Sequence, residues 1–313
     1  MCSTITRVLI AGAGAIGAMV AESIYRSGKF TVSVLASHTR FDRYSRSGFT
    51  INGRSVHLPL TRAGSGEQFD FVIIACKNHH LPEVLADLST HIGEHTLILS
   101  LLNGISSEED IARQYGEARL PYAMIIGTDA VRSGTSITYT KPGIIYFGDA
   151  TNTPPYSERV RSIATFFGQA GIQCVIPENM RNRLWYKYMM NVALNQLTGI
   201  TRSGYRILQT ATRTESARVL FEAAMREVIA VAAERGIELG QADIDSIYRT
   251  LDTLSPDGKT SMCQDIEAGR KTEVELFGKK MMEMGAESGI AVPVNTYFYH
   301  TIMTIENGAK SVP

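Results

Sequence analysis

A glycine-spaced hexapeptide near the N-terminus, GAGAIG at residues 12–17, constrains the fold more than any other feature. It follows the apolar run RVLIA at residues 7–11 and opens a helical pattern over residues 15–27. In such a strand–turn–helix, the first glycine permits the tight turn, the second lets a pyrophosphate approach the backbone, and the third lets the helix pack on the strand. We therefore predict a dinucleotide-binding turn rather than an accidental glycine-rich one. The residues of this turn are Gly12, Ala13, Gly14, Ala15, Ile16 and Gly17.

Short apolar runs alternate with helical patterns through the first half of the chain. Continuous apolar strands between helices are typical of a parallel sheet that is covered on both faces. Further strands are expected at residues 31–35, 70–76, 96–101 and 173–176, and helices at residues 81–88 and 156–170. Residues 122–148 carry turn signals and predict strands with a hairpin. These patterns predict an α/β Rossmann-type domain over residues 1–177.

After Pro177 the pattern becomes helical to the end of the chain. Helices are expected at residues 180–197, 214–235, 244–251 and 271–288. A length of 313 residues suits two domains at roughly 100–200 residues each. We therefore predict an all-α domain over residues 178–313, and the motifs described below imply that it carries the substrate and catalytic groups.

Composition excludes several classes of function. Thirty-one basic and 31 acidic residues balance, so the chain lacks the broad basic field of a nucleic-acid or anionic-membrane binder. The four cysteines form no C-x-x-C pair, which argues against a zinc site or disulfide framework and favours a reducing, cytoplasmic location. The apolar run at residues 8–21 is shorter than the roughly 20 residues of a membrane span. His79 and His80 lack a third ligand at suitable spacing, so no metal is predicted.

The segment after the second strand bears on the choice of cofactor. NAD-binding proteins usually place an acid there for the ribose 2′-hydroxyl. This chain instead has ASHTR at residues 36–40, an acid-free loop in which Ser37 and Arg40 could bind a 2′-phosphate. NADP(H) is therefore favoured over NAD, the alternative being that Arg40 is a solvated loop charge.

A polar stripe is expected on the helix at residues 180–197. Lys187, Asn191 and Asn195 recur every fourth residue, which places them on one face. An ammonium and two amides could hold a carboxylate and a hydroxyl while the lysine protonates a nascent alkoxide. The alternative is a solvent-facing stripe on which Lys187 lies with its charge in water.

Several motifs in a fixed order resemble those of the ketopantoate reductase (2-dehydropantoate 2-reductase) family along nearly the whole chain. Besides GAGAIG and the stripe that begins at Lys187, they are Lys77 after a strand, Asn103 in a Leu-Asn-Gly motif, and the block from Ser261 to residue 273. The resemblance implies an N-terminal Rossmann domain, a helical C-terminal domain and a site in the cleft between them. It implies NADPH-dependent reduction of ketopantoate to pantoate, on the route to pantothenate and coenzyme A.

The resemblance also implies roles for single residues. The lysine matching Lys187 is the general acid, and Glu273 matches a position that contacts the cofactor and assists catalysis. Substrate-binding positions match Asn103, Asn191, Asn195 and Ser261; cofactor-binding positions match Lys77, Asn103, Glu273 and Ala130.

Two helical details come from the residues themselves. Asp265 lies one turn after Ser261 and is interpreted as structural. Thr272 and Glu275 are spaced like a capping box, which predicts a helix start there with Glu273 in its first turn.

The chain also departs from the family pattern. Ala36 and Ser37 stand where an arginine is common, Gln196 replaces a proline, and Ser203 replaces a substrate-binding asparagine. A different 2-keto or β-hydroxy acid is therefore an alternative substrate, and a non-catalytic NADP-sensing protein is a second alternative. Residues 220–231 could line a homodimer contact, although a core helix is the commoner explanation of such an apolar stretch.

Overall fold

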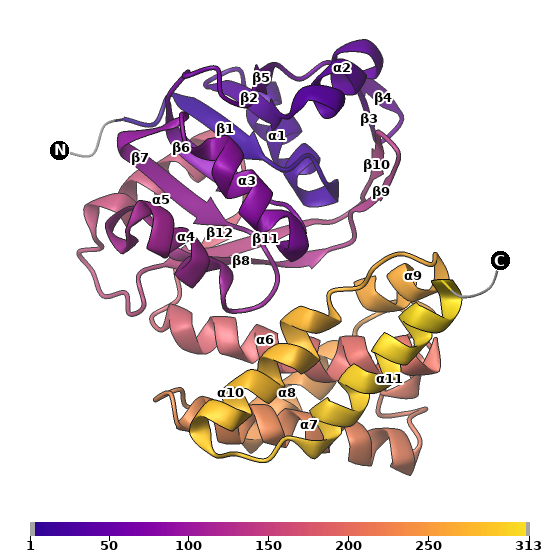
Figure 1. Ribbon diagram of the computed structural model, residues 1–313. Helices are drawn as coiled ribbons and strands as arrows, with labels where there is room; N and C mark the ends of the chain where they lie inside the picture. The colour runs from indigo at the N-terminus through magenta and orange to yellow at the C-terminus, as the bar shows by residue number, and fades with distance from the viewer. Residues whose placement is uncertain (1–3, 311–313) are drawn as a thin grey trace. The chain divides into compact units, whose positions relative to one another are not determined.

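The computed structural model describes residues 4–310 and divides the chain into two compact units. Unit 1 is Met1–Arg181 and unit 2 is Asn182–Pro313 (Figure 1). Among the residues described, every β-strand lies in unit 1, and unit 2 consists of helices and their connections. The predicted class, an α/β Rossmann-type domain followed by a helical one, is therefore confirmed.

A five-stranded parallel sheet forms the centre of unit 1, in the order β5-β2-β1-β6-β7. Its strands are β1 (Arg7–Ala11), β2 (Thr31–Ala36), β5 (Leu60–Arg62), β6 (Phe69–Ile74) and β7 (Ile92–Ser100). The chain proceeds from β1 to β2 on one side and later returns to β6 on the other. The carboxyl ends of β1 and β6 therefore flank the point where the strand order reverses, which is where such sheets bind ligands.

Helices cover both faces of this sheet (Figure 1). They are α1 (Ala15–Ser27) and α5 (Glu158–Ala170) on one face, and α3 (Leu81–Leu88) and α4 (Ser107–Tyr115) on the other. Ile10 of β1 belongs to the core under α1 and α5, while its neighbour Leu9 belongs to the core under α3 and α4. Because successive side chains of a strand point to opposite faces, the central strand must be apolar throughout.

The remaining strands form two smaller sheets. One, in the order β4-β3-β10-β9, contains β3 (Phe49–Ile51), β4 (Arg54–Val56), β9 (Val131–Ser133) and β10 (Ser136–Thr138). The other, in the order β12-β11-β8, contains β8 (Tyr122–Thr128), β11 (Pro142–Gly148) and β12 (Cys174–Val175). β9 and β10 pair antiparallel, so the predicted hairpin is present.

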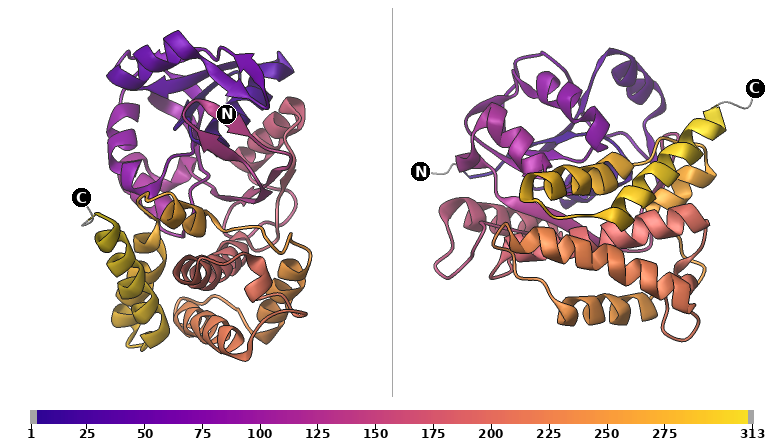
Figure 2. Two further views of the ribbon diagram at one scale, coloured as in Figure 1. Left: turned by 90° about the vertical axis from the view of Figure 1, so that its right-hand side faces the viewer. Right: turned by 60° about the horizontal axis from the view of Figure 1, so that its bottom comes forward.

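Unit 2 is built from helices (Figure 2), and their buried apolar side chains form its core. The helices are α6 (Met180–Thr201, which begins at the end of unit 1), α7 (Glu215–Ala233), α8 (Gln241–Asp252), α9 (Ser261–Glu267), α10 (Lys280–Ser288) and α11 (Pro293–Lys310). Phe221, Met225 and Val228 of α7 are fully buried, so the core accounts for most of the apolar stretch at residues 220–231. Val219 and Leu220 remain 51% and 36% exposed.

Residues 4–310 also contain four short helical segments. Three are 3₁₀ turns, η1 (Asn78–His80), η2 (Glu117–Arg119) and η3 (Tyr205–Ile207); η4 (Glu275–Lys279) is a π-helix. The helix predicted over residues 271–288 is present as a continuous helical run over residues 274–288, but it begins three residues later than predicted and Glu275–Lys279 are π-helical. No helix in residues 4–310 combines the length and hydropathy of a membrane span.

The predicted loop after the second strand is also wrong. Ser37 is the N-cap of a further helix, α2 (His38–Ser47), and Arg40 lies in its first turn. This helix contains four charged residues, and Phe41 and Tyr44 are its large apolar ones, so it has too few apolar residues for an apolar pattern to reveal it. The acid-free character of the segment is unchanged.

The predicted capping box at Thr272 does not form. The Thr272 hydroxyl accepts a hydrogen bond from the Val274 N–H over 3.2 Å and donates one to Glu306 of α11. The Thr272 N–H also donates to Glu306 Oε1 over 2.9 Å. Because the buried Glu306 carboxylate holds this threonine, Glu273 precedes the helical turn instead of lying in it.

Candidate active site

The glycine turn after β1 is shaped by close backbone contacts. Gly12 has a φ of 109°, and a Cβ on it would lie 2.8 Å from the backbone of Ala75 and Cys76, after β6. A Cβ on Gly17 would collide with the Gly12 carbonyl oxygen. Both positions therefore require glycine for the turn itself and for the close packing of α1 on β1.

Gly14 differs, because the protein's own packing does not demand glycine there. A Cβ on Gly14 would meet only the Ala75 carbonyl oxygen at 3.5 Å, an ordinary contact. Gly14 is also the N-cap of α1, whose first turn has neither a side-chain cap nor an acidic residue. The N–H groups at the start of α1, next to Gly14 with its missing side chain, therefore suit the pyrophosphate of a dinucleotide.

Arg132 of β9 contacts this turn, which sequence reasoning missed. Its Nη1 donates to the Ala13 carbonyl, its Nη2 to the Tyr44 hydroxyl over 3.2 Å, and its Nε to Gly134 over 2.7 Å. Burial raises the pKa of Tyr44, but hydrogen bonds and charges from Arg132 and Arg43 outweigh it and hold that pKa below its ordinary value. No local pattern signals this role, because 119 residues separate Ala13 and Arg132.

A second arginine lies beside the end of β2. In the parallel pairing of β2 with β5, Ala36 is the register partner of Arg62. The Arg62 guanidinium lies 3.7 Å above the Phe41 ring and 3.7 Å from Asp42, and its side chain is half-exposed. The strand pairing therefore places an arginine next to Ala36 that the linear sequence around residues 36–40 does not show.

Three further predicted cofactor positions lie in unit 1. Lys77 directly precedes η1 after β6, and Asn103 follows β7 just before Gly104, whose φ is 92°. Both follow carboxyl ends of neighbouring parallel strands, the same edge as the glycine turn. Ala130 lies between β8 and β9, where its N–H donates to Thr128 Oγ1 over 3.2 Å.

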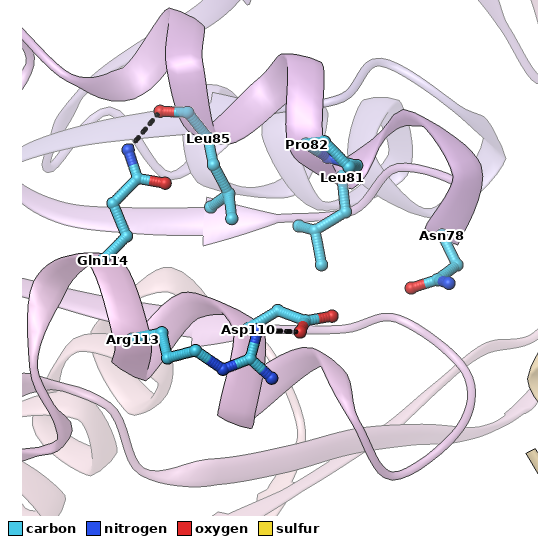
Figure 3. Close-up of a pocket in the computed structure, with 7 residues that line it drawn as sticks. All are labelled: Asn78, Leu81, Pro82, Leu85, Asp110, Arg113 and Gln114. Carbon is cyan, nitrogen blue, oxygen red and sulfur yellow. Dashed lines mark hydrogen bonds and ion pairs between the residues drawn. The ribbon is translucent and has the colours of Figure 1, made fainter. Parts of the chain in front are cut away.

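A cavity of about 560 Å³ lies between α3 and α4, beside η1 (Figure 3). It is lined by Asn78, Leu81, Pro82, Leu85, Asp110, Arg113 and Gln114. Arg113 pairs with Asp110 at 3.0 Å, and Gln114 donates to the Leu85 carbonyl over 3.4 Å. None of the predicted substrate residues lines this cavity.

The predicted polar stripe lies on α6 within unit 2 and does not face water. Lys187 is 8% exposed and Asn195 is 5% exposed, and Asn191 is half-buried. The neighbouring Trp185 and Met189 are buried as well. The alternative of a solvated surface stripe is therefore excluded, since a lysine is almost never buried without a partner or a task.

The structure brings two of the predicted substrate residues together. The Ser261 hydroxyl donates to Asn195 Oδ1 over 3.3 Å, and the Met262 N–H donates to the same atom over 3.4 Å. One turn along α6, Thr198 and Thr260 share a hydrogen bond of 2.8 Å between their hydroxyls. The start of α9 is therefore held against the polar stripe of α6.

The remaining predicted residues of unit 2 have separate places. Glu273 is half-buried and directly precedes the turn that runs into the π-helix. Asp265 accepts a hydrogen bond from Arg270 Nε over 2.7 Å, in keeping with a structural role. Over residues 4–310, no three His, Cys, Asp or Glu side chains gather as metal ligands would.

Two family models match the sequence. Residues 8–152 match the model described as "Ketopantoate reductase PanE/ApbA", and residues 179–306 match its C-terminal domain, "Ketopantoate reductase PanE/ApbA C terminal". Among curated relatives, a 2-dehydropantoate 2-reductase of Archaeoglobus fulgidus is 25% identical over 97% of this chain and 99% of its own length. An uncharacterized oxidoreductase of Bacillus subtilis, YkpB, is 25% identical over 96% and 99%.

Solved structures share the same fold. The 2-dehydropantoate 2-reductase of Geobacter metallireducens is 25% identical with a TM-score of 0.84, covering 95% of this chain and 99% of that one. D-mandelate dehydrogenase in a ternary structure with NADH and anilino(oxo)acetate is 22% identical with a TM-score of 0.87, covering 97% and 100%. The glycine turn fits a nicotinamide dinucleotide, and the two family models span both units. The chain therefore belongs to the ketopantoate reductase family of oxidoreductases.

Proposed function

We propose that this protein reduces a 2-keto acid to a 2-hydroxy acid with NADPH, with ketopantoate as the first candidate substrate. One observation carries the proposal: a buried lysine, Lys187, shares a helix face with Asn195, which is hydrogen-bonded to Ser261. A lysine kept from water among amide and hydroxyl groups suits proton donation to an oxygen that gains negative charge.

The chemistry divides between the cofactor and the side chains. A bound NADPH supplies the hydride that the keto carbon C2 accepts. Lys187 donates a proton from its Nζ to the former carbonyl oxygen, which becomes the hydroxyl, and the lysine regains its proton from solvent. Asn191, Asn195 and Ser261 orient the carboxylate and the carbonyl, and their fixed positions lower the entropic cost of reaction. Asn103 and Glu273 assist where substrate and nicotinamide meet.

The choice of NADPH rests on positive charge at the end of β2. Arg40 lies in the first turn of α2, and Arg62 lies beside Ala36 in the sheet. No acidic residue occurs in the first turn of α2 or among residues 36–40. Guanidinium groups bind phosphate through charge-assisted hydrogen bonds, whereas an NAD site places a carboxylate here.

Ketopantoate as substrate places the protein in a biosynthetic sequence. Reduction of ketopantoate yields pantoate, which leads to pantothenate and coenzyme A in the cytoplasm. The family match supports this assignment. The departures from the family pattern at Gln196 and Ser203 fall among the motifs that bind substrate in the family, and they favour a related keto acid instead.

The test is NADPH oxidation followed by absorbance with ketopantoate, pyruvate, 2-ketoisovalerate and oxaloacetate, each repeated with NADH. The proposal expects turnover of a 2-keto acid, fastest with ketopantoate and NADPH. Fast turnover of a different keto acid would retain the reaction and replace the substrate. Tight NADPH binding without turnover of any keto acid would favour a cofactor-sensing protein instead.

A second candidate is reduction of an aryl 2-keto acid with NADH. The structural neighbour D-mandelate dehydrogenase, solved with NADH, supports including it. Phenylglyoxylate with NADH and with NADPH is therefore the additional arm of the assay. A preference for phenylglyoxylate and NADH would replace both the substrate and the cofactor of the first proposal.

We also propose that the protein forms a homodimer. A ketopantoate reductase from Staphylococcus aureus, similar in structure with a TM-score of 0.79, is described as dimeric. In unit 2, Val219 and Leu220 of α7 and Tyr297 of α11 are large apolar side chains left exposed. Light scattering after size-exclusion chromatography should give a mass near twice 34.3 kDa, and Leu220→Glu should lower it to one chain.

A further inference from the structure

The α6 helix carries a second stripe beside the catalytic one. Tyr188, Val192 and Gln196 each follow one residue after Lys187, Asn191 and Asn195. Since one residue turns an α-helix by about 100°, the two stripes run side by side along α6. The members of the second stripe are at most 1% exposed, so they are buried in the core of the structure.

Tyr188 ties this stripe to the π-helix η4. Its hydroxyl donates to the Leu276 carbonyl over 3.2 Å and to the Phe277 carbonyl over 3.3 Å. A π-helix widens the turn and changes the usual pairing of its carbonyl groups, and such turns are frequent at functional sites. Burial raises the pKa of the Tyr188 hydroxyl, so it remains a donor at every physiological pH.

Gln196 contacts the same π-helix two turns further along. Its Oε1 lies 2.5 Å from the place where a Cβ on Gly278 would stand, so only glycine leaves room for it. Its Nε2 donates to Asn295 Oδ1 of α11 over 3.0 Å. A proline at position 196 could not make this contact, because it has no side-chain amide.

The π-helix in turn follows Glu273 closely. The Leu276 N–H donates to the Glu273 carbonyl over 2.9 Å, which joins this residue to the first turn. Tyr188 therefore connects the helix that carries Lys187 to the segment that carries Glu273. Lys187 is its sequence neighbour on one side, and Leu276 is its hydrogen-bond partner on the other.

We propose that Tyr188 is a positioning residue, whose hydroxyl fixes the rotation of α6 against η4 and thereby places Lys187 relative to Glu273. The inference rests on the proposed function, because Lys187 and Glu273 are its reacting groups. Tyr188 itself does not touch substrate in this scheme. Loss of its hydroxyl would let α6 and η4 shift slightly, and small displacements of reacting groups lower turnover steeply.

The test compares Tyr188→Phe with Tyr248→Phe. Tyr248 is the matched control, because it is a buried tyrosine of unit 2 whose hydroxyl contacts Glu222 at 3.3 Å, on α7. We expect Tyr188→Phe to lower kcat by about 10- to 100-fold and to leave the KM for NADPH within about twofold. The pH at which kcat falls on the alkaline side should also shift, since the proton donor has moved. Tyr248→Phe should change none of these values.

Hydrogen exchange supplies a readout that does not depend on turnover. In Tyr188→Phe, amides of residues 274–279 should exchange faster than in the wild type and in Tyr248→Phe. Unchanged exchange would overturn the inference, and so would faster exchange with unchanged kcat and pH profile, which would make Tyr188 merely structural. Absence of turnover in the wild type would instead count against the proposed function. The hydrogen-exchange comparison would still test whether the Tyr188 hydroxyl stabilises η4.

Discussion

The hydroxyl of Ser261 donates a hydrogen bond to Asn195 Oδ1 over 3.3 Å, and so joins the first residue of α9 to the polar stripe of α6. The same oxygen accepts the Met262 N–H. Under the proposed function Asn195 therefore has two tasks, since its oxygen holds α9 and its amide N–H groups are proposed to bind the substrate.

Asn195→Asp separates these two tasks. An aspartate keeps an oxygen for Ser261 and Met262 but adds a negative charge where a substrate carboxylate would bind. We expect the KM for the keto acid to rise by at least about tenfold, the equivalent of about 1.4 kcal/mol, with little change in melting temperature. Gln264→Glu adds the same negative charge on α9, one turn after Ser261, and should leave the KM for the keto acid unchanged. Equal KM values for both variants would remove Asn195 from the substrate site.

Lys187→Met removes the proton donor and keeps an unbranched side chain in the buried position. We expect kcat to fall by about 10²- to 10⁴-fold, the usual contribution of a general acid. The dissociation constant of NADPH should not change, because the glycine turn that is proposed to bind the cofactor lies in unit 1. Lys259→Met, which removes an exposed lysine paired with Glu267, is the control for loss of charge. Near-normal turnover in Lys187→Met would refute the assignment.

Gly14→Ala should weaken cofactor binding without unfolding the protein. The added methyl has room within the chain, but it would occupy the approach of the pyrophosphate. We expect a rise of about 100-fold in the dissociation constant of NADPH, measured by fluorescence titration, with unfolding free energy within about 1 kcal/mol of wild type. Gly17→Ala should instead lower the melting temperature, because its methyl meets the Gly12 carbonyl. Tight cofactor binding by Gly14→Ala would contradict the site.

The arginines at the end of β2 should discriminate NADPH from NADH. Arg40→Gln and Arg62→Gln each remove a guanidinium near Ala36 and should raise the KM for NADPH by about tenfold, while leaving that for NADH almost unchanged. Arg46→Gln removes the same charge from the last turn of α2 and serves as the control. If neither variant changes the ratio of the KM for NADPH to the KM for NADH, these arginines do not bind the 2′-phosphate. Either other residues then bind it or NADH is the natural cofactor.

Asp70 should make the stability of the fold fall as the pH becomes acidic. Burial raises the pKa of its carboxyl, but hydrogen bonds from the Thr6 and Arg7 N–H groups and from the Thr6 hydroxyl outweigh burial and lower it. A carboxyl whose pKa is lowered by folding stabilises the native state above its unfolded pKa, which is about 3.9, and loses this effect as pH falls.

Asp70→Asn should therefore lower the urea midpoint at pH 7, and the gap from wild type should narrow at pH 3. Glu94→Gln, at an exposed position of β7, should have the same urea midpoint as the wild type at both pH values. A gap for Asp70→Asn that is the same size at pH 3 would show that ionisation of Asp70 plays no part.

The sequence predicted those parts of the fold that depend on local patterns. Residues 7–11 are a continuous apolar run, residues 81–88 place apolar side chains at helical spacing, and the polar residues of α6 recur every fourth position. The structure contains the strand and both helices. The helix α2 was missed, because few apolar residues mark its buried side. The π-helix was missed as well, since no local pattern marks it, and its contacts with Tyr188 and Gln196 come from residues some 80 positions earlier in the chain.

Tertiary contacts also explain what the sequence could not show about the site. The capping box at Thr272 was overridden by Glu306, a residue 34 positions later. Arg132 reaches Ala13, and Arg62 lies beside Ala36, only because strands distant in sequence come together. The glycine motif can be recognised in the linear sequence, whereas the charged side chains around it are brought there by strand pairing and helix packing.

The two adjacent stripes of α6 also limit how this family member can evolve. A one-residue insertion between Tyr188 and Asn191 would turn everything beyond it by about 100°, so that Asn191 and Asn195 would leave the face of Lys187. Gln196 would lose Gly278 in the same event. Within this segment, new substrate preferences must therefore arise by exchange of side chains, and changes in length belong to the connections outside α6.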